Sequence, residues 1–287
     1  MLVLASIGFF ACGGQAADDI GFHYPECVGT AGDTIDVGVV NAGSMELSGL
    51  AAMRTDASIL WTFGDSGNPA ELYALDPATG MPANGSSDVS ITNVANFDWE
   101  DIATAPCSAG ECIYIADTGD NDLVRNNVTI YEVVPPGPIA ARFVQTYADG
   151  PHNLEALFID ERDASSYGIS KVTTGDATIF MFPRAEATNV PVVIGNLTIP
   201  TGDNRVTAAD MRVDACSARI LVRTRTNVFG YFGPPETAVA DLFAQAPIEL
   251  TAPAEPQGEA IAWSADGRAY FTISEGASPT LHRVDFK

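Results

Sequence analysis

Short apolar runs, rich in β-branched and aromatic residues, alternate along the chain with clusters of Gly, Asn, Asp and Pro. Runs of this kind, bounded by turn-forming residues, are typical of β-strands rather than helices. Beyond the N-terminal segment, no stretch shows sustained helical periodicity. The pattern therefore predicts an all-β protein.

One motif recurs five times, each time with polar residues just before an apolar strand: MELSGLAAM, FDWEDIATA, HNLEALFID, VTAADMRVD and PQGEAIAWS. We aligned the copies on the apolar residue that follows the polar pair, which gives spacings of 52, 55, 54 and 50 residues. The aligned column contains Ser48, Glu100, Glu155, Ala209 and Glu259. A repeat of this length is typical of a β-propeller, in which each repeat forms one blade.

The last repeat ends at Lys287 after its third strand-like run, although a blade needs four strands. An unassigned run, TIDVGVVN at residues 34–41, precedes the first repeat. Pairing of this run with TLHRVD in the last repeat would close the ring and leave no sheet edge open. We therefore predict a five-bladed propeller of four-stranded antiparallel blades, in a single domain over residues 34–287.

The N-terminal residues 1–12 form an apolar run that ends in small residues and a cysteine, and this run is too short to span a bilayer. The sequence from Ala11 to Gly14 resembles a bacterial lipoprotein cleavage site, which would leave Cys12 as the lipidated first residue. An ordinary secretory signal cleaved nearby is the alternative. Residues 13–33 would then be a linker. We expect a propeller anchored by lipid to the bacterial cell envelope, or otherwise secreted.

The four remaining cysteines are an even number, which suits an oxidising compartment. Cys107 and Cys112 flank the turn between the first two strands of the second repeat, so we predict a bridge that closes this hairpin. Cys27 precedes the closing strand, and Cys216 lies in the equivalent turn of the fourth repeat. Both should lie on one face, which favours a second bridge. The alternative is four reduced cysteines in the core.

The formal net charge is −23, from 14 basic and 37 acidic residues. This charge argues against binding to nucleic acid or to an anionic membrane surface, so any membrane contact would be through Cys12 alone. An acidic balance is compatible with divalent cations, and also simply with solubility outside the cell. The sequence contains no GxSxG, HExxH or Walker motif. We expect a monomer.

One mouth of the central tunnel is the predicted site, because the innermost strand of a blade begins on the face where the second strand ends. Three glutamates converging there would repel one another unless a cation compensates them. Hard oxygen ligands without His or Cys favour calcium. The alternative is pairing with basic residues and no metal. The candidate calcium ligands are Ser48, Glu100, Glu155 and Glu259.

Loops after the second strands should add polar groups to the same mouth, where they would bind a small polar or anionic ligand or a partner protein. Trp99 flanks Glu100 and could wall a sugar or a base, although core packing is the default for such a residue. The candidate ligand contacts are Asp65, Asp120, Asn121, Arg223, Glu275 and Trp99.

A calcium-dependent hydrolase of phosphate esters or nucleotides is the alternative function. Calcium, Lys171 and Arg225 would stabilise developing negative charge, while Glu155 or Asp117 orients water. We rank binding ahead of hydrolysis, because no nucleophile or base can be singled out from the sequence.

Two resemblances to known families emerge from these motifs. The order Ser, Glu, Glu, gap, Glu, beginning with MELS, resembles the calcium-activated nucleotidase (apyrase) family. That resemblance implies calcium held in the tunnel of a five-bladed propeller by Ser and Glu side chains at inner-strand starts, with Ala209 where that family has a second Ser. The segments GDSGNPAELYALD, DWEDIA, IADTGDN followed by Arg125, HNLEAL, TAAD and GEAIA are similar to a group of secreted bacterial propellers. The second resemblance implies the fold and a shared site, but no substrate.

Overall fold

The computed structural model describes residues 27–41, 46–85, 88–135, 137–184 and 189–287. The predicted signal segment 1–12 with Cys12, and most of the predicted linker 13–33, lie outside the described residues. Within the described part, no helix is both long and apolar enough to cross a membrane.

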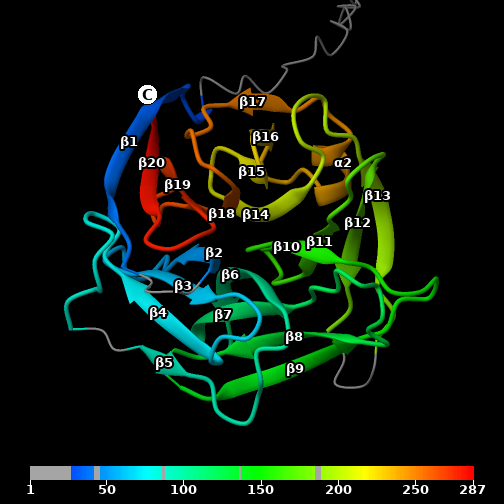
Figure 1. Ribbon diagram of the computed structural model, residues 1–287. Helices are drawn as coiled ribbons and strands as arrows, with labels where there is room; N and C mark the ends of the chain where they lie inside the picture. Colours follow the sequence, from blue (N-terminus) through cyan, green and yellow to red (C-terminus); the bar gives the residue numbers. More distant parts are fainter. Residues whose placement is uncertain (1–26, 42–45, 86–87, 136, 185–188) are drawn as a thin grey trace, which may run out of the picture.

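Five four-stranded antiparallel sheets surround a central axis as the blades of a propeller, as predicted (Figure 1). Blade 1 contains β2 (Leu47–Ala52), β3 (Leu60–Gly64), β4 (Glu71–Leu75) and β5 (Val89–Ser90). Blade 2 contains β6 (Trp99–Cys107), β7 (Gly110–Asp117), β8 (Val128–Val133) and β9 (Ile139–Gln145). Blade 3 contains β10 (Leu154–Ile159), β11 (Ser166–Ser170), β12 (Ala177–Phe182) and β13 (Val192–Leu197). Blade 4 contains β14 (Val206–Val213), β15 (Ala218–Thr224), β16 (Val228–Gly233) and β17 (Ile248–Leu250).

Blade 5 is shared by the two ends of the described chain. It contains β18 (Gly258–Trp263), β19 (Ala269–Ser274), β20 (Thr280–Phe286) and, as its outer strand, β1 (Ala31–Val39). β1 pairs antiparallel with β20, so the blue and red ends of the ribbon lie side by side in Figure 1. This pairing confirms the predicted ring closure. The strand begins a few residues before the predicted start at residue 34.

The core lies between neighbouring blades. The inner strands β2, β10 and β18 are buried along their whole length. Between blades 1 and 2, for example, Trp99 packs edge-on against Phe63 with 5.6 Å between ring centroids. A short helix, α2 (Val239–Phe243), buries Leu242 beside blade 4. Sequence periodicity did not predict it, because five residues are too few to show a helical repeat.

Both predicted disulfides are present. Cys107–Cys112 closes the hairpin between β6 and β7, and Cys27–Cys216 ties the segment before β1 to the turn between β14 and β15. The second bridge fastens the N-terminal end of the described domain to blade 4. Two disulfides are typical of a protein that works in an oxidising, non-cytoplasmic environment.

Candidate functional site

Every inner strand has a register shift near its start, where it pairs with the second strand. In β6, Trp99 lies opposite Asp117 and Asp101 opposite Ala116, so Glu100 is an extra residue without a partner. Such a β-bulge redirects a side chain, and bulges are common beside functional sites. The second residues of the five inner strands form what we call the bulge ring: Ser48, Glu100, Glu155, Thr207 and Glu259.

The fourth member of the bulge ring corrects the sequence alignment, which placed Ala209 in this column. In β14, Val206 pairs with Thr224 and Ala208 with Arg223, so Thr207 is the bulged residue. The backbone N–H of Ala209 donates to Asp101 Oδ2 at 3.1 Å. Blade 4 therefore contributes a hydroxyl to the ring rather than a gap.

The three glutamates of the bulge ring converge at the tunnel mouth. Glu100, Glu155 and Glu259 each have a carboxylate oxygen within 4.8 Å of the other two, and all three residues are buried. Burial, followed by repulsion from Glu155, raises the pKa of both Glu100 and Glu259 well above the usual value. Glu259 Oε2 is buried and has no hydrogen-bond partner among the described residues. A cation would relieve both the repulsion and this unpaired oxygen.

The two hydroxyls of the bulge ring link neighbouring blades. Ser48 Oγ donates to the carbonyl of Glu100 at 2.7 Å, and Thr207 Oγ1 donates to the carbonyl of Gly258 at 3.2 Å. A hydroxyl that donates its proton still has lone pairs with which it can coordinate a metal. The ring thus offers oxygen donors from all five blades.

Lys171 partly compensates the glutamates. Its Nζ lies 2.6 Å from Glu155 Oε2, while Asn153 Nδ2 donates to Glu155 Oε1 at 2.9 Å. Burial lowers the pKa of Lys171, but the neighbouring carboxylates, Glu155 first, outweigh burial and hold this pKa above its ordinary value. Glu155 is thus paired with a basic residue in the way that the metal-free alternative expects. One ammonium group cannot neutralise three carboxylates.

A second set of polar residues surrounds the bulge ring. In every blade, one backbone hydrogen bond joins the start of the inner strand to the end of the second strand. Its acceptor is the carbonyl of the residue two positions before the bulge-ring residue, and its donor is the N–H of the residue that follows the second strand. This contact places two side chains from each blade together at the mouth. We call these the rim pairs: Glu46–Asp65, Asp98–Thr118, Asn153–Lys171, Arg205–Arg225 and Gln257–Glu275.

The rim pairs divide the mouth into an acidic and a basic half. On blades 1, 2 and 5, Asp65 has a carboxylate oxygen within 4.8 Å of those of Glu46 and Glu275, and it forms a second such group with Asp98 and Glu100. Burial and then the charge of Asp98 raise the pKa of Asp65 to about 6. Blades 3 and 4 bring Lys, Arg and Asn instead. Charge on the rim is therefore separated across the tunnel.

The basic half contains a cavity of about 570 Å³. Of the predicted ligand contacts, Asn121 lies here, as do the predicted catalytic cations Lys171 and Arg225. Asn153 and Arg205 also line it, and sequence reasoning did not single them out. A sequence signal was present for Asn153, which lies two residues before Glu155, but not for Arg205, because the alignment placed Ala209 rather than Thr207 in the ring column.

Two predicted ligand contacts lie inside the protein instead. Trp99 is fully buried between blades, as the default interpretation of this residue expected. Arg223 is also fully buried, and its Nη2 lies 2.6 Å from Glu255 Oε2. Neither side chain is placed to contact a ligand at the mouth, since both are covered by protein.

Two further predicted residues hold the loop that follows β7. Asp117 Oδ1 lies 2.9 Å from Arg125 Nη2, and Asp120 accepts the backbone N–H groups of Val124 and Arg125. These contacts brace the loop over residues 117–125. Asp117 and Asp120 therefore shape the rim, whereas Asp65 and Glu275 belong to its acidic half.

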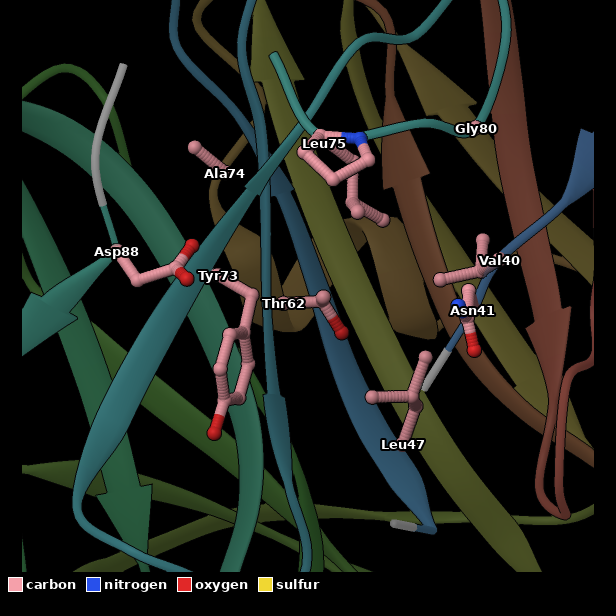
Figure 2. A pocket seen from close by; sticks show the side chains of 10 residues that line it. Val40, Asn41, Leu47, Thr62, Tyr73, Ala74, Leu75, Gly80 and Asp88 are labelled. Carbon is pink, nitrogen blue, oxygen red and sulfur yellow. The ribbon is translucent and has the colours of Figure 1, made fainter. Parts of the chain in front are cut away.

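A separate cavity of about 220 Å³ lies against blade 1, and Figure 2 shows its lining. Apolar side chains such as Val40, Leu47 and Leu75 dominate it, together with the Thr62 hydroxyl and the Asp88 carboxylate. Thr62 Oγ1 has no hydrogen-bond partner among the described residues. This cavity lacks the convergent charges of the tunnel mouth.

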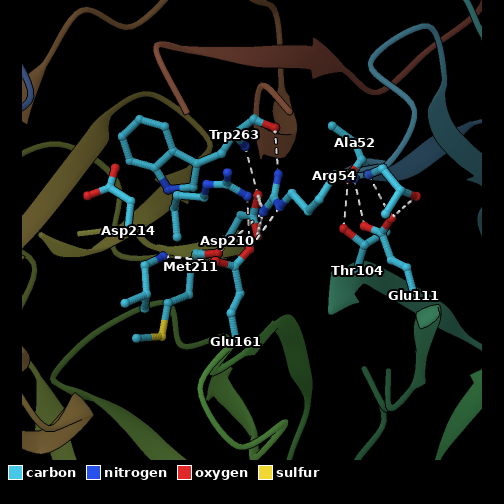
Figure 3. A network of polar contacts seen from close by, with 12 residues as sticks. Ala52, Arg54, Thr104, Glu111, Glu161, Asp210, Met211, Asp214 and Trp263 are labelled. Atoms are coloured by element: carbon cyan, nitrogen blue, oxygen red, sulfur yellow. Dashed lines mark hydrogen bonds and ion pairs between the residues drawn. The ribbon is translucent and has the colours of Figure 1, made fainter. Parts of the chain in front are cut away.

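An ion-pair network lies at the other ends of the inner strands, and Figure 3 shows its contacts. Arg54 follows β2, and its guanidinium lies 2.9 Å from Glu161 and 3.3 Å from Asp210. Asp210 Oδ2 also accepts the backbone N–H of Trp263 at 2.7 Å. Arg54 thus joins blades 1, 3, 4 and 5 away from the bulge ring.

No protein-family model and no curated protein sequence matches this chain. Among solved structures, one described as a glucose dehydrogenase has 9% sequence identity and a TM-score of 0.48, and the match covers 89% of this chain and 100% of that chain. Similarity this remote carries no information about activity.

Proposed function

We propose that this protein is an extracytoplasmic calcium-binding β-propeller whose tunnel mouth binds a small polar or anionic ligand or a partner protein. The observation that carries the proposal is the bulge ring, in which three buried glutamates converge and Glu259 Oε2 lacks a partner among the described residues. Anchoring through Cys12 as a lipoprotein completes the proposal.

Calcium is the cation that this donor set suits best. It takes six to eight oxygen ligands from carboxylates, hydroxyls, carbonyls and water. The three glutamates, with Ser48 and Thr207 beside them, would hold it, and the remaining positions would be open to water or to ligand oxygen atoms. Because Lys171 lies against Glu155, calcium would have to weaken that ion pair in order to use Glu155 fully.

Hydrolysis of phosphate esters, the function that resemblance to apyrases implies, has weaker support. Both oxygens of Glu155 are occupied, by Lys171 and Asn153, while Asp117 is held by Arg125 through Oδ1 and its other oxygen is buried away from water. Neither candidate is poised to take a proton from water. Binding therefore remains the first proposal.

Thermal unfolding in EDTA, in calcium and in magnesium tests the proposal. Calcium at a hundred times its Kd should stabilise the protein by about 2.7 kcal/mol. In a domain of this size, that raises Tm by roughly 5–10 °C. Magnesium should act weakly, because it requires smaller, more regular geometry. An unchanged Tm in calcium would contradict the metal site.

Phosphate release from nucleotides and phosphate esters, measured on the same samples, separates the two functions. We expect no turnover in calcium. Turnover that requires calcium and is lost in Glu155→Gln would replace the binding proposal with the hydrolase.

A further inference from the structure

We infer that the basic half of the mouth is a binding site for a small organic oxyanion, with the Arg225 guanidinium as its principal contact. This inference names the ligand class of the proposed function, and it rests on that proposal only in placing the ligand at this mouth. It does not require calcium.

The lining of the 570 Å³ cavity is unusual for so acidic a protein. The chain has 37 acidic and 14 basic residues, yet this lining includes three basic residues and no carboxylate. The volume lies within the usual range for small-molecule sites, roughly 300–1,000 Å³. A cavity of this size and charge suits a small anion.

Arg225 is the cation in this cavity that direct contacts leave uncompensated. Lys171 is paired with Glu155, and Arg205 with Asp203. Among the described residues Arg225 forms no ion pair within 4 Å, although from a longer distance its charge acts to lower the pKa values of Asp203 and Glu275, and its Nε is buried without a hydrogen-bond partner. An arginine fork binds a carboxylate or phosphate group through two parallel hydrogen bonds.

The other lining residues suit the organic part of such a ligand. Leu123 is 54% exposed and lines the cavity together with Val172, so both offer apolar contact. Leu123 has a φ of 53°, a conformation that costs energy for a side chain of this size. Hydroxyls of Thr173 and Thr174 supply additional hydrogen-bonding groups. The cavity therefore favours an oxyanion attached to a small apolar group.

Isothermal titration with benzoate and with phenylphosphonate, both in EDTA, tests the inference. Because the protein has a net charge of −23, general electrostatics repels both probes, and binding reports a local site. We expect one site per chain for at least one probe. Tighter binding of benzoate would identify a carboxylate ligand, and tighter binding of phenylphosphonate a phosphate-type ligand. Failure of both probes to bind would overturn the inference.

Arg225→Gln should weaken binding at least about tenfold, equivalent to about 1.4 kcal/mol. Arg225→Lys keeps the charge but loses the planar fork, so its affinity for the probes should lie between those of Arg225→Gln and the native protein. The control is Arg268→Gln, which removes the same charge at an exposed position in the turn after β18 and should bind as the native protein does. Unchanged binding in a folded Arg225→Gln protein, or equal loss in the control, would also overturn the inference. Since calcium is absent, these outcomes are independent of the metal site.

Discussion

Glu259→Gln should change stability in opposite directions with and without calcium. Without calcium, Glu259 is a buried carboxylate whose Oε2 lacks a hydrogen-bond partner among the described residues. Burial and repulsion from Glu155 oppose the charge of this carboxylate, and each pKa unit by which they do so is equivalent to about 1.4 kcal/mol. The amide is nearly isosteric and uncharged, so it removes this cost. We expect the free energy of unfolding in EDTA to rise by about 1–2 kcal/mol, or roughly 2–8 °C in Tm.

In calcium, the same substitution removes a charged ligand. The variant should lose most of the calcium-dependent stabilisation, about 2.7 kcal/mol at a hundred times the native Kd. The assay is thermal unfolding of both proteins, in EDTA and across a calcium titration, at one pH and ionic strength. A variant that is less stable in EDTA, or that keeps the full calcium response, would refute this reasoning.

Glu255→Gln is the matched control, because Glu255 is also a buried carboxylate at the start of blade 5. It differs in being paired with the buried Arg223 at 2.6 Å. Breaking a buried ion pair costs about 3–5 kcal/mol. This control should therefore lower stability under both conditions and keep the calcium response.

Four further predictions follow from particular contacts. Lys171→Gln should raise calcium affinity by about tenfold in direct calcium titrations, since an ammonium group no longer competes with calcium for Glu155. A lower calcium affinity in this variant would contradict the proposed site. In EDTA, Tm should rise when the pH is lowered from about 7 to about 5, because carboxyls with raised pKa values, such as Asp65 at about 6, bind more protons in the folded than in the unfolded state. A Tm that falls steadily over this range would contradict this prediction. Arg54→Met should lower the free energy of unfolding in denaturant by about 3–5 kcal/mol, because it breaks a buried ion-pair network. The calcium response should be kept, since that network lies away from the bulge ring, and a lost response would contradict this separation. Replacing both cysteines of the Cys27–Cys216 bridge by Ser should lower the free energy of unfolding by about 2–5 kcal/mol, and an unchanged value would show that the bridge contributes no stability.

The fold could be predicted from the sequence because its signals are local and repeated. Five copies of one motif set the number of blades, and the unassigned run before the first repeat provided the closing strand. Both disulfides followed from where their cysteines fall in the turns. Each of these inferences needed only the order of strands, not their detailed register.

The candidate site could be predicted only in part, because it depends on register. A β-bulge adds a residue that no apolar pattern reveals, so the alignment chose Ala209 where the structure has Thr207. Arg223 and Arg225 have equivalent sequence surroundings, yet one lies in β15 and is buried against Glu255, while the other follows the strand and lines the cavity. Sequence pattern alone does not reveal which of the two faces a neighbouring blade.

The most direct test of the central claim is the crystal structure of the protein grown with calcium, with anomalous diffraction recorded to identify the ion. We predict one anomalous peak inside the bulge ring, with oxygens of Glu100, Glu155 and Glu259 at the calcium–oxygen distances of about 2.3–2.6 Å. A ring without such a peak, in which Lys171 alone balances the three carboxylates at saturating calcium, would contradict the account.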